Sequence, residues 1–440
     1  TLLGGGSFSL ATGGNGSATS AGGSLVLAVQ KNKLSADWLG STASGFNRLD
    51  VSANSAARLL AGALAVAVTT GQNSNSGSGA IALVIVDNDV RAKVDKSDAG
   101  DSSLTGAEVN VNAQSVTGLS ALDGLFSQAG LTALSHTELD LDGAQTTQQI
   151  DGGIDTQDDL FAEDGSTTGN TTEQKLFSGQ IAGEAVLAIA GNVAASSGKT
   201  SVGGAVSVVY TGSDYTASLA NTEVDLTGDL SVNAGNSTDV LAAAIGAAGA
   251  KENAVSGSAT AVVARGSINA NVDMTGKTLK ANNLTVKAAK GGGAYSLAGN
   301  ITGSSSNASV GGAISLSDMQ QTAAATVDNG NYTLTGDVDI GAALQSRIMT
   351  AALSGQVSGS GSAVGGAITF NRIADTTTAR LNNAIMSARD LSISASQPGL
   401  GASIWSVAFN LSTAGGSAGV GGAVAVNLID AERSASLTDS

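Results

Sequence analysis

One phrase returns along the chain at nearly constant spacing, and it restricts the possible folds more than any other feature. Its clearest copies begin Val-Gly-Gly-Ala and continue with alternating apolar residues, and they span residues 202–209, 310–316, 364–370 and 420–426. A degraded copy lies at 256–263. The anchoring alanines Ala205, Ala259, Ala313, Ala367 and Ala423 are separated by 54, 54, 54 and 56 residues. A fixed period of this size indicates a repeat protein, in which each unit buries its apolar face against its neighbour.

Each repeat divides into four strand-like runs, which are clearest in the repeat at residues 295–342. The runs are 295–302, 310–316, 322–327 and 336–340. Asp-Asn-Gly-Asn at 328–331 is a strong turn signal, and the last run alternates polar and apolar residues as a half-buried strand does. We therefore predict four strands per repeat. The two halves of a repeat differ, which favours one wide coil per repeat over two narrower coils, although both arrangements stay open.

Strands that recur with equivalent residues in equivalent places predict an all-β fold, a parallel β-solenoid (β-helix) built from four-strand repeats of 54–56 residues. In such a fold equivalent residues of successive coils stack on one another about 4.8 Å apart. An array of immunoglobulin-like sandwiches is the alternative, but each sandwich needs about 100 residues and a larger aromatic core. Only 3% of the residues are aromatic. Gly and Ala in their place predict a thin core with closely spaced sheets.

The array is interrupted once. Two early copies, at 22–27 and 78–83, stand 56 residues apart, but Ala80 and Ala205 are 125 apart. We therefore divide the chain into repeats (1–114), an acidic insertion (115–182) and further repeats that end mid-repeat (183–440). Residues 116–134 have the apolar spacing of an amphipathic helix, weakened by three glycines. Ten Asp or Glu and no Lys or Arg lie between residues 138 and 173. Insertions in solenoids project from one face, often the binding face.

Charge and composition exclude several classes of function. A net charge of −16 and a pI of about 4.3 argue against nucleic acid or an anionic membrane as partner. No apolar run reaches the roughly 20 residues that span a bilayer, so we predict no membrane insertion. The absence of Cys excludes disulfides and thiolate metal sites. Because the sequence begins mid-pattern at Thr1, we expect any secretion signal to lie upstream.

The acidic insertion is the main candidate metal site, and a cation ladder of the turn aspartates Asp229, Asp337 and Asp390 is a lesser one. Ca²⁺ prefers clustered oxygen ligands, and the candidate ligands are Asp140, Asp142, Asp151, Asp155, Asp158 and Asp159. No calcium-loop motif is present, so a solvated acidic loop is the simpler interpretation. We predict no other cofactor.

Other motifs have structural explanations. Gly-Lys-Thr at 198–200 and 276–278 lacks the upstream glycine and following helix of a phosphate loop, which predicts two inter-strand turns. His136, the only histidine, has no partners for catalysis or zinc binding and is interpreted as an exposed loop residue. The scattered aromatics Trp38, Phe46, Trp405 and Phe409 are interpreted as turn plugs or core fillers. Capping of local turns accounts for Asp229, Asp337 and Asp390.

Three segments carry a family resemblance: Gly421–Asn427 (Gly-Gly-Ala-Val-Ala-Val-Asn), Thr378–Ala384 (Thr-Ala-Arg-Leu-Asn-Asn-Ala) and Gly228–Ala234 (Gly-Asp-Leu-Ser-Val-Asn-Ala). They resemble the units of large repetitive bacterial surface adhesins of the leukotoxin-like and filamentous-haemagglutinin-like kind. The resemblance covers everything outside the insertion. It implies secretion to the extracellular space or bacterial cell surface, a β-solenoid shaft, and a role in attachment or envelope structure. It supplies no catalytic residues.

We therefore expect a structural or adhesive segment of a surface protein or extracellular fibre. Its partners would be copies of itself stacked end to end, or the continuation of a longer repeat chain, and a host or neighbouring-cell surface or glycan. A carbohydrate-active β-helix enzyme is the alternative. Such enzymes use clustered carboxylates and basic residues along one face, whereas the 20 Lys and Arg here repeat in no column. We expect no enzymatic activity.

Overall fold

The computed structural model describes residues 2–12, 17–55, 58–96, 102–115, 184–397 and 401–440. These residues form strands and turns, with no helix among them. The acidic insertion, with its predicted helix, its candidate Ca²⁺ ligands and His136, lies outside the described residues.

Each repeat is one coil, and each complete coil after the insertion has four strands. In the repeat that the sequence shows most clearly, these are β14 (Gly293–Ser304), β15 (Ala308–Asp328), β16 (Asn331–Leu334) and β17 (Val338–Leu344). The next coil begins with β18 (Arg347–Ser358). Val310 pairs with Val255 on one side and Val364 on the other, so neighbouring strands are one whole repeat apart. This register confirms the solenoid and settles the open question in favour of one coil per repeat.

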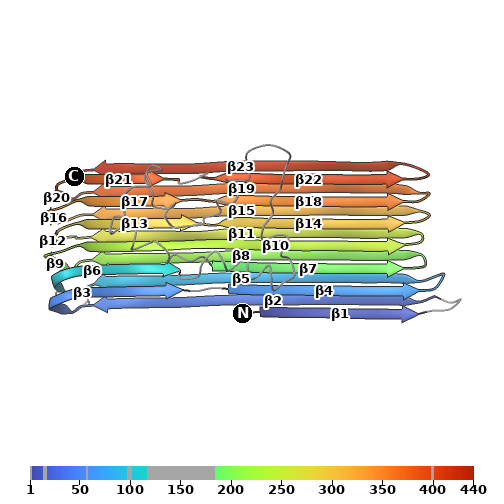
Figure 1. Cartoon of the computed structure of the whole chain (residues 1–440), viewed down its shortest axis with the longest axis horizontal. Coiled ribbons are helices and arrows are strands. Elements are labelled where there is room, and N and C mark those ends of the chain that lie inside the picture. Colours follow the sequence, from blue (N-terminus) through green and yellow to red (C-terminus); the bar gives the residue numbers. More distant parts are fainter. Residues whose placement is uncertain (1, 13–16, 56–57, 97–101, 116–183, 398–400) are drawn as a thin grey trace, which may run out of the picture.

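The coils stack into two parallel sheets (Figure 1). The first, which we call the long sheet, has seven strands: β2 (Thr19–Leu39), β5 (Asn75–Asp95), β8 (Thr200–Ala220), β11 (Asn253–Asp273), β15, β19 (Ser362–Asn382) and β23 (Gly419–Thr438). The second, the return sheet, contains sixteen strands. Beyond those already given, these are β1 (Leu2–Thr12), β3 (Thr42–Ser55), β4 (Arg58–Thr70), β6 (Ser103–Ser115), β7 (Glu184–Ser196), β9 (Glu223–Leu226), β10 (Leu230–Ala250), β12 (Thr278–Ala281), β13 (Leu284–Gly291), β20 (Ile385–Ser387), β21 (Leu391–Ser396) and β22 (Ser403–Ala414).

The strand boundaries differ from the sequence-based prediction. Runs 310–316 and 322–327 belong to one continuous strand, β15, because the alternation of buried and exposed residues persists through the intervening Ser317–Gln321. The fourth strand of the coil is instead the short β16, which follows the predicted turn at 328–331. There Asn329 and Gly330 have positive φ, as that turn sequence requires.

The degraded copy was aligned one residue too far along. Ser258, and not Ala259, pairs with Ala205 and Ala313, and Gly257 pairs with Gly204 and Gly312. The physical reason is the two-residue period of a strand: a slip of one residue would move every side chain to the opposite face. Alanine identity alone misled the alignment.

Besides a small cluster of alanines that includes Ala298 and Ala313, the described interior contains two larger apolar clusters, which polar residues separate. One cluster includes Tyr215 and the other includes Val209. Between them lies a set of buried polar side chains, which we call the polar belt: Asn88, Glu184, Ser213, Lys290, Gln321 and Asp375. On the Val209 side the inward residues are mostly Ala, Ser, Thr and Gly, so the interior there is thin, as composition predicted.

The insertion leaves and re-enters the coil without disturbing its register. Gln114 near the end of β6 pairs with Gly235, and Glu184 at the start of β7 pairs with Thr238. Between these two pairs β10 contains only Asn236 and Ser237, whereas residues 115–183 lie between Gln114 and Glu184 in the sequence. The strands on both sides belong to the same solenoid, and Ala80 pairs directly with Ala205.

Candidate functional site

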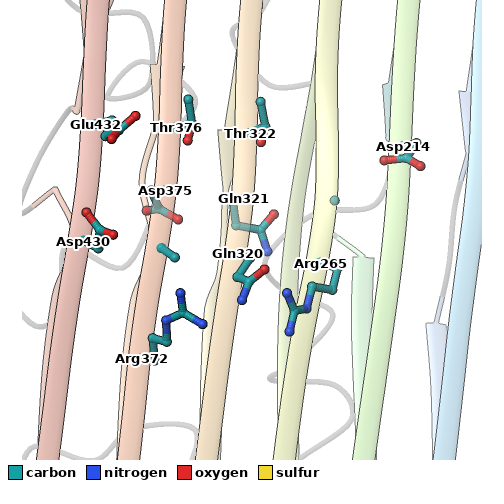
Figure 2. A pocket seen from close by; sticks show the side chains of 12 residues that line it. Asp214, Arg265, Gln320, Gln321, Thr322, Arg372, Asp375, Thr376, Asp430 and Glu432 are labelled. Atoms are coloured by element: carbon teal, nitrogen blue, oxygen red, sulfur yellow. The ribbon is translucent and has the colours of Figure 1, made fainter.

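A charged hollow of about 500 Å³ opens on the long sheet near the middle of its strands. Five successive strands, β8, β11, β15, β19 and β23, each contribute to its lining (Figure 2). The lining residues are Asp214, Arg265, Gly266, Gln320, Gln321, Thr322, Arg372, Ala374, Asp375, Thr376, Asp430 and Glu432. Outward positions of a strand lie two residues apart, so neighbouring positions on stacked strands converge on this hollow.

The rim of the hollow carries both signs of charge. The Arg265 guanidinium forms an ion pair with Asp318 at 2.6 Å. Asp214 accepts hydrogen bonds from the Ser267 backbone N–H at 2.9 Å and from its hydroxyl at 2.6 Å. In Figure 2 the arginine side chains lie toward one end of the hollow, and Asp430 and Glu432 line its flank on β23. A small polar ligand with hydroxyls would find both donors and acceptors here.

The polar belt lies in the interior, at the same position along the strands as the charged hollow. Glu184 accepts hydrogen bonds from Asn88 Nδ2 and Tyr215 Oη at 2.6 Å each, and from Ser213 Oγ at 2.9 Å. Thr238 Oγ1 donates a fourth bond at 3.3 Å. A buried carboxylate costs several kcal/mol unless its oxygens are hydrogen-bonded in this way. Glu184 is the first residue of β7, so this network fixes the strand that follows the insertion.

Burial shifts the pKa of the belt's other ionisable groups toward their neutral forms. Desolvation lowers the pKa of Lys290 to about 8, against the opposing charges of Glu184, Asp214 and Asp375. Desolvation raises the pKa of Asp375 to about 6, although the charge of Lys290 opposes this shift. The pKa of Tyr215 is raised by burial and by the Glu184 charge. These shifts follow from structural burial, because Lys290 and Asp375 are almost inaccessible to solvent.

The candidate sites from the sequence are distributed as follows. Both Gly-Lys-Thr tripeptides lie at turns between strands, as predicted: 198–200 precedes and starts β8, and 276–278 links β11 to β12. The possible Ca²⁺ ligands of the insertion are outside the described residues. Among the residues that are described, no group of three or more His, Cys, Asp or Glu is arranged to hold a metal ion.

Two of the three turn aspartates, Asp229 and Asp337, act across coils, whereas Asp390 forms an ion pair with the adjacent Arg389 of its own turn at 3.6 Å. Asp229 Oδ1 accepts bonds from the backbone N–H and side-chain amide of Asn283, one coil further on, at 3.1 and 2.9 Å. Asn283 Oδ1 in turn accepts the Asp337 N–H at 2.8 Å, and Arg389 binds Asp337 through two nitrogens at 2.8 and 2.6 Å. Each coil thus caps the next at this corner.

Two of the four scattered aromatics were assigned wrongly. Trp38 and Phe46 pack against the apolar cluster that contains Tyr215, as expected of core fillers. Trp405 and Phe409 instead lie on the outer face of β22, with 39% and 54% of their surface exposed. Single-residue identity could not distinguish these cases, since the face depends on register.

Sequence reasoning missed the charged hollow. A search for one residue type repeated in a column cannot find it, because the hollow combines different residues from each repeat: Arg265, Gln320, Ala374 and Asp430 share one column. Aligning the repeats in register would have placed them together. No protein-family model, curated protein or solved structure matches the chain. No helix of the described residues is long and apolar enough to cross a membrane.

Proposed function

We propose that this chain is a structural shaft segment of an extracellular bacterial fibre or surface adhesin. The observation that carries the proposal is the unbroken parallel register of the seven long strands, which continues past the insertion. A stack of this kind is a quasi-one-dimensional object whose stability is shared among neighbouring coils. Its polar contacts, including the cross-coil caps at Asp229 and Asp337, serve the stacking itself.

Attachment is the second half of the proposal. The shaft would hold residues 115–182 at a fixed height, and this acidic segment would contact a cell surface or glycan. End-to-end stacking of coils would extend the shaft, because unpaired strand edges accept further strands. The secreted location and the adhesin role are supported by the repeat resemblance and by the composition.

Imaging and binding together test the proposal. Electron micrographs should show straight rods, and labelled chain should bind to cells or to an array of glycans. A matched variant with residues 115–183 replaced by Asn-Ser, the two residues that β10 has between the same paired positions, should remain a rod and lose binding. Compact spheres would contradict the shaft, and equal binding by the variant would contradict the role of the insertion.

The charged hollow supports one second candidate, a carbohydrate-active enzyme. Paired carboxylates can hydrolyse glycosidic bonds, and Asp430 and Glu432 both line the hollow. Release of reducing ends from polyanionic glycans, abolished by Asp430→Asn and by Glu432→Gln, would establish this activity. No release across a broad substrate panel would leave the hollow as a structural or binding feature.

A further inference from the structure

The outer surface of the long sheet is divided into a charged part, which holds the hollow, and an apolar part. The apolar part consists of four adjacent columns of outward residues, which pass through Val202, Gly204, Val206 and Val208. We call it the lateral face. Across all seven long strands these columns contain only Val, Ile, Leu, Phe, Ala and Gly, and no polar or charged side chain.

The lateral face reverses the usual distribution of side chains. Leu25 is 69% exposed and Ile314 is 42% exposed. The inward neighbours on the same strands are small, such as the fully buried Ser207 and Ser315. From strand geometry the face measures roughly 30 Å along the solenoid axis and roughly 27 Å along the strands, or roughly 800 Å². The largest apolar patch on a typical monomer is about 300–600 Å².

The Gly204 column adds a feature that the fold does not require. Each of the seven long strands places a glycine in it, from Gly23 to Gly422. A Cβ at Gly204 would meet nothing within 4 Å, and one at Gly312 would meet only the Gly366 carbonyl at 3.7 Å. None of these glycines has positive φ. The column therefore forms an open groove along the axis, flanked by the Val202 and Val206 columns.

We propose that the lateral face pairs with the lateral face of a second copy of this chain. Its area matches the roughly 800 Å² per partner of a standard stable interface. Consider a two-fold axis that is parallel to the solenoid axis and lies between the Gly204 and Val206 columns. It places the Val206 column of each copy opposite the Gly204 groove of the other. Only a partner with the same axial spacing can keep this match along every coil. The uncharged face offers no complementarity to an ionic partner.

Sedimentation of the full chain tests the proposal. The wild type should form dimers, and Ile314→Lys/Ile368→Lys should raise the dimer dissociation constant by about 100-fold or more, because the dimer would bury unpaired charges. The matched control is Ile301→Lys/Leu353→Lys, which alters exposed apolar residues of β14 and β18 on the return sheet. It should leave dimerisation unchanged. Circular dichroism should show the same β content in all three proteins.

A second variant tests the groove without adding charge. Gly312→Leu fills the groove while leaving the coil intact, and it should weaken dimerisation by at least about tenfold. Electron micrographs should show dimers of twice the thickness, measured perpendicular to the sheets. End-to-end stacking would instead double the length along the solenoid axis. The proposal is overturned if the wild type remains monomeric at its solubility limit, if it binds phosphatidylcholine vesicles as a monomer, or if only the Ile301→Lys/Leu353→Lys control dissociates.

Discussion

At the scale of single residues, the two glycines of the Val-Gly-Gly-Ala phrase have opposite surroundings. The first, such as Gly311, faces inward, and a Cβ there would lie 2.1 Å from Asn300 Nδ2. The second, Gly312, faces outward over the lateral face. Sequence periodicity identified the pair as the anchor of the repeat. Periodicity could not show that the two glycines have different surroundings, because the inward contact depends on a partner residue of the return sheet.

These surroundings predict different effects of the same substitution. Gly311→Ala should destabilise the chain by about 1–3 kcal/mol, since the interior must shift to admit the methyl group. Gly312→Ala should be neutral or stabilise it by up to about 1 kcal/mol, because alanine restricts the unfolded chain. Urea unfolding of both variants measures this. Equal losses of unfolding free energy for the two variants would contradict the inward placement of Gly311 and the outward placement of Gly312.

Two buried carboxyls predict an unusual response to pH. Burial raises the pKa of Asp239 and Asp375 to about 6, well above the usual range of an aspartate, although Arg347 opposes the shift at Asp239 and Lys290 opposes it at Asp375. The folded state therefore binds these protons more tightly. Their favourable contribution is complete below about pH 4 and is lost as the pH rises through 6, to the extent of about 3 kcal/mol per group at most.

Asp375→Asn should remove its share of this dependence. The melting temperature of the variant minus that of the wild type should become more positive between pH 4 and pH 7. Asp337→Asn serves as the control, because the hydrogen bond and charge of Arg389 lower the pKa of Asp337 and its stabilisation is lost toward acid pH. The melting temperature of Asp337→Asn minus that of the wild type should change in the opposite direction. A constant difference for Asp375→Asn would show that its carboxyl is not buried as described.

At the scale of elements, the junction between the two halves of the return strand absorbs changes in length. One residue, Gly292, separates β13 from β14, two separate β17 from β18, and 68 separate β6 from β7. The paired strands on both sides keep their register. A solenoid tolerates such insertions because the hydrogen bonds on each side are made to neighbouring coils and not across the junction.

This arrangement predicts that the shaft folds without residues 115–183. Replacing them with Asn-Ser should change the melting temperature by only a few degrees, with the β signal in circular dichroism retained, since no described strand pairing is removed. The control deletes β7 as well, which removes pairings to β4 and β10 and should cause a large loss of stability. Unfolding of the Asn-Ser variant would contradict the described junction.

Element boundaries show where sequence reasoning ended. The turn at 328–331 and the strand 336–340 were predictable from Gly, Asn and alternation, and both are present as a turn and as β17. The continuity of β15 was not, because Ser317 and Gln321 lie inside the solenoid and broke the apolar pattern. These side chains point inward although the Ser317 hydroxyl and Gln321 Oε1 have no hydrogen-bond partner among the described residues, so the pattern of a single repeat gives no reason to place them inside.

At the scale of the whole molecule, the period alone predicted the solenoid, since equivalent residues 54–56 apart can stack only if each repeat closes one turn or two. The choice between these required the pairing of Val310 with Val364. The charged hollow and the lateral face were beyond prediction from one repeat at a time. Both depend on columns that run across coils, and a slip such as that at Ser258 moves residues between columns.

The most direct test of one coil per repeat is a distance between spin labels at Ser35→Cys and Ser434→Cys, outward positions of the first and last long strands. They occupy the same column, six coils apart. The chain has no native Cys to interfere, and dilution with unlabelled chain suppresses distances between copies. Double electron–electron resonance should give a narrow distribution near 29 Å, from about 4.8 Å per coil. A distance near 58 Å would mean two coils per repeat and would contradict the account, as would a broad distribution from separate modules.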